Sequence, residues 1–428
     1  MFIQIHMLQS LPPSNVNRDD TGQPKKCVFG GVTRGRISSQ CLKRNIRCSP
    51  QFKKAFGEDL ATRTLYLPRM VADALKGGRL GVPDDDLDEV MGAIASKFKR
   101  DRSPEDVEGD GEDAESTEGV SSSGSDLEKT GQLVFFPPPY ALRVAELVAA
   151  LRRRSRRAYE RFIGRKLNPK PTKDEEKALK SEMQGFIQDI SRASEALTVD
   201  VALFGRMTTS DLVVDVDATC QVAHAISTHE TLIESDYFTA MDDRKADYAS
   251  TQTERTGAAF LGSGDTETYY DSAVYYKYFN IDTDALRDKK HMPSLSLHDV
   301  GNIVETFVIA AAFTNPTGKQ NSFAAHSANE LILLEASEVK RPLSHANAFL
   351  QPVYGPNLMS ESAKALSRYI DSVSAAYAPS DTTRSLLAVG NAALLELQSA
   401  HSRVNTIDEL VKWIAGTFAR QGQREVAK

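Results

Sequence analysis

The residues best suited to chemistry lie between Arg18 and Lys54, where ten Lys or Arg residues accompany only two acidic ones. The densest part is residues 34–44, in which Arg34 and Arg36 precede two serines and further basic residues. Phosphate oxygens accept charge-assisted hydrogen bonds from guanidinium and ammonium groups, so this run favours a polyanionic ligand. The pattern predicts a phosphate-binding surface.

A short strand over residues 33–37 and a helix beginning at Ser38-Ser39 are the elements that must position this surface. Either serine can cap the helix, and Leu42 with Ile46 gives it one apolar stripe. The other side of the helix carries Gln40, Lys43, Arg44 and Arg47. The free N–H groups and the dipole at a helix start attract phosphate, and the serine hydroxyls add donors. The alternative is a basic helix face that contacts only solvent.

The length of 428 residues, with 41% apolar and 26% charged side chains, suits one large domain with insertions or two domains. A net charge of -6 would by itself disfavour nucleic acid. However, residues 101–130 carry eleven acidic groups against two basic ones. The rest of the chain is therefore slightly positive, and its charge excludes no nucleic-acid partner.

Three other groups of residues can be read in more than one way. Asp19 and Asp20 could hold a metal ion and cleave RNA, or form an ion pair or a turn. His224 and His229 stand five positions apart, which suits structural roles better than shared metal ligation. The four cysteines show no CxxC spacing, so we expect free thiols and no zinc site formed by them. We predict no cofactor, no metal and no catalytic residue.

Hydrophobic periodicity predicts an α+β fold with helices outside a mostly antiparallel sheet. Besides the helix that begins at Ser38-Ser39, we expect helices at about 59–77, 86–99, 138–163, 172–195, 303–313 and 406–420. We expect strands at 2–9, 33–37, 199–204, 211–216, 220–228 and 322–334, and a long hairpin over 236–281. Residues 101–132 contain almost no apolar side chains and are predicted to form a disordered acidic insertion.

The sequence also bears on the compartment of the protein. No window approaches the roughly 18 consecutive apolar residues that a membrane helix needs. Residues 1–6 lack the basic segment followed by an apolar one that marks a secretory signal. We expect a cytoplasmic protein that does not contact a membrane.

Six blocks of sequence, in order, resemble the CasC family. The first combines Asn17–Asp20, Phe29–Gly31 and Arg36–Arg44. The others are Asp200–Ser210, Val222–His229, Asp236–Asp243, Ala259–Gly262 and Pro342–Phe349. Members of that family are the repeated backbone subunits of Cascade, the type I-E CRISPR surveillance complex. Six ordered blocks are much more specific than any one of them.

The resemblance implies a fold with an RRM-like (ferredoxin-like) palm, an inserted helical fingers domain and a projecting β-hairpin thumb. Mapped onto this chain, the parts are palm 1–49, fingers 50–196, palm 197–235, thumb 236–270 and palm 271–428 with C-terminal helices. It also implies a non-catalytic protein whose copies oligomerise along crRNA and present it to target DNA in antiviral defence. The implied partners are crRNA, the paired target DNA strand, further copies of itself and other Cascade subunits.

The resemblance and the basic pattern together give the predicted site residues. The RNA-binding set is Arg18, Arg34, Arg36, Ser38, Ser39, Gln40, Lys43, Arg44, Arg47, Arg206 and Lys319, of which Lys319 matches only a loosely similar loop. Family wedges beside a displaced nucleotide correspond to Met207, Phe238 and Leu261, which could instead belong to the core. Tyr275, Tyr276 and Tyr278 could stack on bases or pack in the sheet.

Two other functions remain open at this stage. One is a metal-dependent endoribonuclease using Asp19 or Asp20. The other is a general single-stranded RNA-binding protein of the RRM type, although the chain lacks the aromatic RNP motif of that class.

Overall fold

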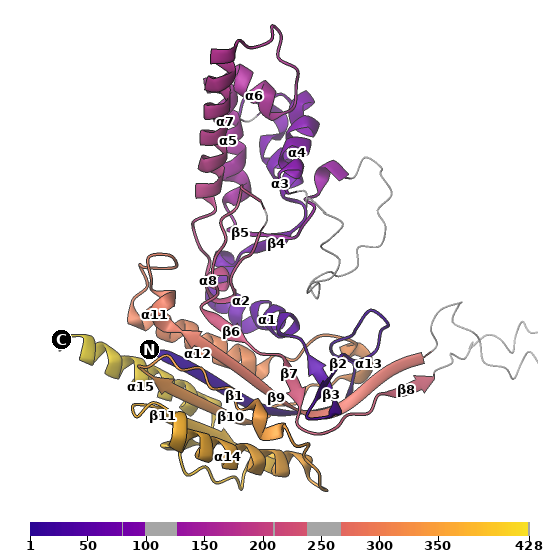
Figure 1. Cartoon of the computed structure of the whole chain (residues 1–428), viewed down its shortest axis with the longest axis vertical. Helices are drawn as coiled ribbons and strands as arrows, with labels where there is room; N and C mark the ends of the chain where they lie inside the picture. The colour runs from indigo at the N-terminus through magenta and orange to yellow at the C-terminus, as the bar shows by residue number, and fades with distance from the viewer. Residues whose placement is uncertain (79, 99–125, 209, 238–266, 427–428) are drawn as a thin grey trace, which may run out of the picture. The chain divides into compact units, whose positions relative to one another are not determined.

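The computed structural model describes residues 1–78, 80–98, 126–208, 210–237 and 267–426 (Figure 1). The described chain forms two compact units. The sheet unit comprises Met1–Ser49, Val222–Ile281 and Val304–Lys428, and the helical unit comprises Pro50–Gln221 and Asp282–Ile303. Three chain segments that are distant in sequence therefore build the sheet unit.

A large mixed sheet forms the centre of the sheet unit. Its strands are β1 (Phe2–Ser14), β2 (Lys26–Phe29), β3 (Val32–Ile37), β7 (Ala225–Ser227), β8 (Glu234–Tyr237), β9 (Glu267–Asp282), β10 (Asn329–Ser337), β11 (Thr383–Ala388) and β12 (Ser402–Val404). The main order is β12-β11-β10-β1-β9-β7-β3-β2, and β8 pairs with β9. β11 and β12 run parallel, whereas β1–β10, β10–β11, β3–β7 and β7–β9 are antiparallel. The α+β class predicted from the sequence is confirmed.

Helices cover the sheet. They are α1 (Ser39–Arg47), α12 (Leu297–Phe313), which starts in the helical unit, α13 (Gln320–Phe323), α14 (Leu358–Tyr377) and α15 (Ile407–Val426), with 3₁₀ turns at Ala346–Phe349 and Gly390–Ala392. Leu366 and Ile370 of α14 pack in one core cluster with Leu333 of β10. Phe307 of α12 meets Phe279 of β9 edge-on, with ring centroids 5.6 Å apart. Apolar burial on the sheet thus positions the strands that lead into α1.

The helical unit has its own core. Its elements are α2 (Pro50–Phe56), β4 (Thr62–Thr64), α3 (Leu67–Leu75), α4 (Leu87–Ser96), β5 (Val134–Phe136), α5 (Tyr140–Arg154), α6 (Arg156–Phe162), α7 (Lys173–Ala193), α8 (Val199–Phe204), β6 (Cys220–Val222), which ends in the sheet unit, and α11 (Thr283–Leu286). Short 3₁₀ turns lie at Gly57–Asp59, Lys76–Gly78, Asp84–Asp86 and Asp126–Glu128. Val71, Ile94, Val148 and Ile190 lie in one buried cluster. None of the described helices of the chain is both long enough and apolar enough to cross a bilayer.

Several sequence predictions are wrong in detail. Residues 199–204 form helix α8 instead of a strand. The alternation of apolar and polar residues suggested a strand with Asp200 on its outer face. Instead, the carboxylate of Asp200 is buried and accepts the N–H of Ala61 at 3.0 Å, so this polar residue also faces the interior. Residues 211–216 form no regular strand, and only Val216 makes an isolated bridge.

Other elements differ in their limits. The helix expected over 138–163 breaks at Ser155, which caps α6 by accepting the Ala158 N–H. The strand expected from 322 begins at Asn329. The acidic insertion predicted over 101–132 lies outside the described residues up to 125, but its end is packed, since the Thr130 N–H donates to the Leu65 carbonyl at 2.7 Å.

Candidate nucleic-acid interface

The start of α1 is fixed by two side chains. Ser38 is the N-cap, and its hydroxyl accepts the N–H of Cys41 at 3.3 Å. The N–H of Ser38 donates to the side-chain oxygen of Asn17 at 2.8 Å, which ties the 15–25 loop to the helix start. Because Ser38 is 5% exposed, its contribution is to shape the site rather than to offer a free hydroxyl.

The helix turns its apolar stripe inward and its polar side outward. Leu42 and Ile46 are buried, whereas Gln40 and Arg44 are exposed and Lys43 is half-buried. No acidic residue occurs in the first turn. Among the described residues, neither Lys43 nor Arg44 takes part in an ion pair. Two cations of α1 are therefore available to a ligand, Lys43 in the middle of the helix and Arg44 in its last turn.

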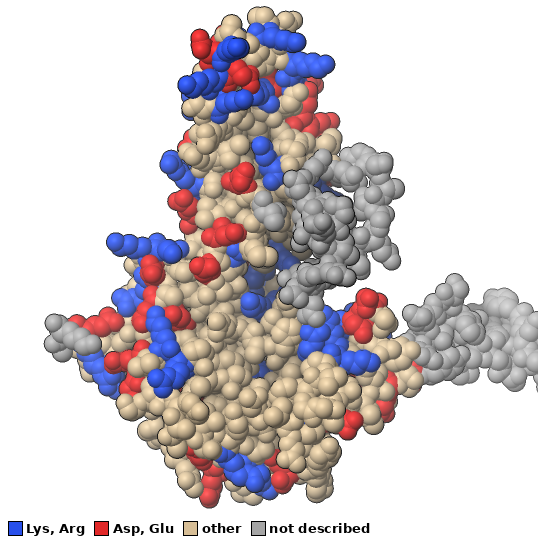
Figure 2. Space-filling model, in the orientation of Figure 1, with Lys and Arg blue, Asp and Glu red and all other residues tan. Residues whose placement is uncertain are grey.

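Arg18 lies in the loop that Asn17 joins to the helix start. It is exposed, and it forms an isolated bridge with Pro24. The N–H of Lys25 donates to the carbonyl of Asn17, and the N–H of Arg36 donates to the carbonyl of Lys25, both at 2.8 Å. In Figure 2, Lys and Arg side chains gather beside the position that β2 and α1 occupy in Figure 1. The structure thus brings Arg18 next to the start of α1.

Asp19 closes a turn in this loop. Its Oδ1 accepts the N–H of Thr21 at 3.0 Å, the hydroxyl of Thr21 at 2.7 Å and the N–H of Gln23 at 3.0 Å. Asp20 is exposed. Among the residues that the structure places, Asp19 and Asp20 join no group of three candidate metal ligands. A carboxylate oxygen held by three donors is typical of a turn.

Arg34 is a structural residue, and the prediction that it contacts RNA is wrong. It is 0% exposed, and its guanidinium donates to the carbonyls of Phe29 at 3.2 Å, Ser227 at 2.9 Å and Phe349 at 2.7 Å. Burial lowers the pKa of Arg34. Its role is to cross-link β3, β7 and the segment that ends at Phe349.

Arg206, in the helical unit, is also a buried structural residue. It is 5% exposed and donates to the carbonyls of Val214 at 2.8 Å, Phe135 at 3.2 Å and Ser194 at 3.0 Å. Burial also lowers the pKa of Arg206. The prediction of RNA contact is therefore corrected for this residue as well, because the guanidinium is buried and all three of its nitrogens donate to backbone carbonyls.

The other predicted RNA-binding residues differ in solvent exposure and in hydrogen-bond partners. Arg36 is half-buried, with Nη1 3.0 Å from Nδ1 of His224. The Ser39 hydroxyl donates to Oε1 of Gln40 at 3.2 Å. The Lys319 ammonium donates to the Thr268 hydroxyl at 3.3 Å. Arg47 is half-buried at the end of α1.

A family model described as CT1975-like protein matches residues 3–413. The chain belongs to the CT1975-like protein family. A chain of a solved "CRISPR RNA-guided surveillance complex, pre-nicking" is 25% identical, has a TM-score of 0.70, and is matched over 97% of this chain and 100% of that one. A chain of another solved "CRISPR RNA-guided surveillance complex" is 21% identical, with a TM-score of 0.60 and coverage of 96% and 99%, and shows the fold alone. No curated protein matches.

In this CT1975-like chain, only one of the three wedge candidates can be placed. Met207, in the helical unit, is 91% exposed, so it does not belong to the core. Phe238 and Leu261 lie outside the described residues. At the base of the predicted hairpin, β8 pairs antiparallel with β9, Glu234 lying opposite Tyr270.

The tyrosines of β9 belong to the sheet core. Tyr275 and Tyr276 are 2% exposed and Tyr278 is 6% exposed, so they cannot stack on bases. His229 is also structural, since its Nε2 accepts the N–H of Val274 at 3.2 Å. None of the four cysteines forms a disulfide, and burial raises the pKa of Cys41 to about 11, so this thiol stays protonated at neutral pH.

The sequence patterns assigned no positioning role to Asn17 or to Gly30 and Gly31, although all three stand in the first family block. Asn17 was recognised only as part of a motif, yet its side chain joins the loop to the helix. Gly30 and Gly31, at φ 63° and 83°, form the two-residue turn between β2 and β3. A Cβ on Gly30 would lie 1.7 Å from the carbonyl oxygen of Leu350, so only glycine fits this position. A Gly-Gly pair between two short strands was the available signal.

Proposed function

We propose that this chain is a guide-RNA-binding subunit of a CRISPR RNA-guided surveillance complex. The observation that carries the proposal is that exposed Arg18 follows Asn17, which is bonded to the capped start of α1, and that Lys43 and Arg44 on this helix have no acidic partner among the described residues. The match to a chain of such a complex over 97% of this chain supports it. Backbone N–H groups and basic side chains contact phosphates without reading bases. A subunit that must accept every guide sequence needs this kind of contact.

The proposal extends to a specific arrangement. The chain acts as the CasC-type backbone subunit of a type I-E Cascade, several copies lying along one crRNA and presenting it to target DNA. Its parts are the RRM-like palm, the fingers over 50–196 and the thumb over 236–270. The hairpin base formed by β8 and β9 supports the thumb, and Met207, exposed in the helical unit, remains a wedge candidate.

The proposed function is non-catalytic. Three donors hold one oxygen of Asp19 in a turn, which favours a scaffold over an endoribonuclease. With excess Mg²⁺ or Mn²⁺, we expect the assembled protein to leave guide and complementary RNA intact. Metal-dependent cleavage that Asp20→Ala abolishes would replace this proposal with the endoribonuclease.

The test of RNA binding is purification of the chain from its native host followed by sequencing of the RNA that accompanies it. We expect RNAs of uniform length that carry CRISPR repeat sequence and varied guide sequences. A heterogeneous sample of cellular RNA would instead indicate a general single-stranded RNA-binding protein.

A further inference from the structure

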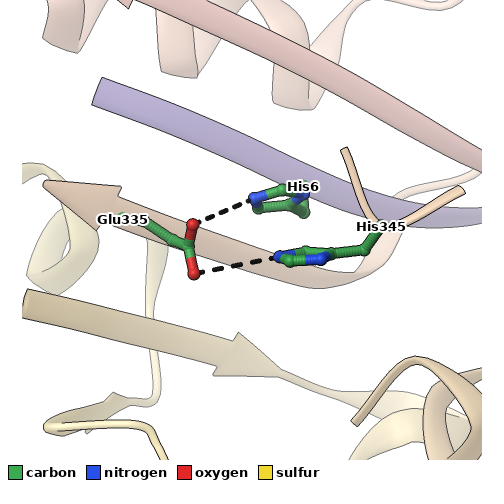
Figure 3. A group of neighbouring side chains, drawn as sticks. All are labelled: His6, Glu335 and His345. Atoms are coloured by element: carbon green, nitrogen blue, oxygen red, sulfur yellow. Dashed lines mark ion pairs between the residues drawn. The ribbon is translucent and has the colours of Figure 1, made fainter. Parts of the chain in front are cut away.

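A buried polar cluster lies in the sheet unit, apart from the basic surface. It consists of His6 on β1, Glu335 on β10 and His345 in the segment that follows β10, and these residues are 0%, 2% and 1% exposed. In Figure 3, both imidazole rings turn a nitrogen toward the Glu335 carboxylate. The rings stack with their centroids 4.5 Å apart. The proposed RNA-binding function uses none of these side chains.

The strand register explains why they meet. Gln4 lies opposite Glu335 in the β1–β10 pair, and Glu335 lies opposite Arg384 in the β10–β11 pair. Since side chains two positions apart share one face of a strand, His6 points to the same side as Gln4. The N–H of His345 donates to the hydroxyl of Tyr276 at 2.9 Å, which holds this residue over the same face.

The cluster leaves three ring nitrogens without a hydrogen bond among the described residues. Nε2 of His6 lies 3.5 Å from Oε2 of Glu335, and Nε2 of His345 lies 4.0 Å from Oε1, both too far for a good hydrogen bond. Both ring nitrogens of His345 lack a partner. Burying a polar group without a hydrogen-bond partner is destabilising. A cation between the rings and the carboxylate would satisfy these nitrogens.

We propose that His6, Glu335 and His345 bind one divalent transition-metal ion, with Zn²⁺ as the best fit. Two imidazoles and one carboxylate are a known zinc ligand set. One ligand atom from each residue lies within 4.8 Å of the others. Tetrahedral ligands about 2.0–2.1 Å from zinc are about 3.3 Å apart. The 3.5 Å between His6 and Glu335 is already close to that spacing. His345 and Glu335, at 4.0 Å, must approach by about 0.7 Å, and the two histidines by at most about 1.5 Å.

The surrounding residues support the ligands as an outer shell does in metal sites. Nδ1 of His6 lies 2.8 Å from the hydroxyl of Tyr276, so a proton on Nδ1 leaves Nε2 free to bind metal. Arg384 Nε donates to Oε1 of Glu335 at 2.5 Å, and Gln4 Nε2 donates to Oε2 at 3.1 Å. Arg384 fixes the carboxylate, but its charge opposes a second cation. We therefore expect weaker binding than at a site without a neighbouring arginine.

Metal binding would have a structural effect. It would tie the segment containing His345 to β1 and β10. Four residues later in that segment, the carbonyl of Phe349 accepts a hydrogen bond from Arg34. The ion would therefore stabilise the part of the sheet unit that holds β3 just before α1.

The test uses the full-length, tag-free protein from cells grown with added zinc, dialysed against metal-free buffer. Metal content is measured by mass spectrometry, and Co²⁺ binding by its visible absorption. The variants are His345→Gln and, as a matched control, His326→Gln, because His326 is exposed. We expect about one zinc per chain in the wild type and in His326→Gln, and an affinity at least tenfold lower in His345→Gln.

A second variant separates metal loss from misfolding. His345→Cys supplies a thiolate ligand, so it should retain zinc and should change the Co²⁺ spectrum by adding sulfur-to-metal charge transfer. Circular dichroism of each variant checks folding. Wild-type protein that is folded but holds no zinc and binds no Co²⁺ would overturn the proposal. Equal zinc in folded His345→Gln and wild type would also overturn it.

Discussion

Two regions of the chain are rich in arginine or lysine, but they differ in the residues that surround the charges. On α5 and α6, Arg154, Arg156 and Arg157 pair with glutamates at 3.0, 3.0 and 3.4 Å. On α1, Lys43 and Arg44 form no ion pair with any residue that the structure describes. Figure 2 shows acidic and basic side chains intermingled at the end of the helical unit. We therefore expect a basic run to bind phosphate only where its charges lack acidic neighbours.

Removing the basic side chains of α1 should have the largest effect. We expect Lys43→Ala, Arg44→Ala and Arg47→Ala together to lower RNA affinity about 100-fold at low salt, and to flatten the salt dependence by roughly one ion per residue. The loss should be equal for all guide sequences, because phosphate contacts carry no base information. Fluorescence anisotropy with several RNAs over a range of salt measures both quantities.

The matched control changes three arginines of the helical unit. Arg154→Ala, Arg156→Ala and Arg157→Ala should alter RNA affinity less than threefold, because these guanidiniums already have partners. Equal losses in the two triple variants would contradict the comparison. A loss on α1 that depends on guide sequence would mean base readout there.

Removing the glutamate partners of the α5 and α6 arginines also tests the difference between the two regions. Glu160→Gln, Glu175→Gln and Glu182→Gln remove the partners of the α5 and α6 arginines. We expect RNA affinity at low salt to rise about tenfold, since the freed charges become a second phosphate surface. Filter binding with the α1 triple variant as background isolates the gain. No gain there would show that pairing is not what keeps these arginines from RNA.

The two helix caps allow a comparison in which the expected effects are smaller. Ser38 caps α1 and Ser155 caps α6, each accepting one backbone N–H, at 3.3 and 3.2 Å. Changing either serine to Ala should cost about 1 kcal/mol of stability in urea unfolding. Only Ser38→Ala should also weaken RNA binding, and Ser38→Thr should restore it. RNA binding that responds to both caps alike would point to a general loss of stability.

The smallest expected effect on stability is at Met207. Because this side chain is 91% exposed, Met207→Ser should change the free energy of unfolding by less than about 0.5 kcal/mol. If Met207 acts as a wedge, chemical probing of bound guide RNA should lose the regular reactivity of displaced nucleotides. An unchanged periodic pattern would place the wedge elsewhere.

The features that the sequence predicted correctly are those that depend on residues close together in the chain. The cap at Ser38 and the buried stripe of Leu42 and Ile46 follow from local spacing, and both are confirmed. The α+β class is confirmed for the same reason, and β9 is a strand within the hairpin expected over 236–281. Local patterns carry this information because cap and stripe lie within one element.

What the sequence could not predict depends on distant partners. Arg34 looks like its basic neighbours, but carbonyls from β7 and from Phe349 enclose it. From its sequence position, Asp200 was predicted to be an outward-facing strand residue, but it is buried in α8, where its carboxylate accepts the N–H of Ala61. The cluster joins His6 to Glu335 and His345, which lie more than 300 positions further along the chain, and no spacing rule links them.

The most direct test of the account is lysine acetylation footprinting of the chain with and without guide RNA. Lys43 lies on the proposed surface and Lys26 is exposed on β2, opposite Gly35 of the strand that leads into α1, whereas Lys177 and Lys180 lie on α7 of the helical unit. The account predicts that RNA slows acetylation of Lys43 and Lys26 at least tenfold and leaves Lys180, whose side chain is 68% exposed, unchanged. Protection of the α7 lysines with full reactivity at Lys43 would contradict it.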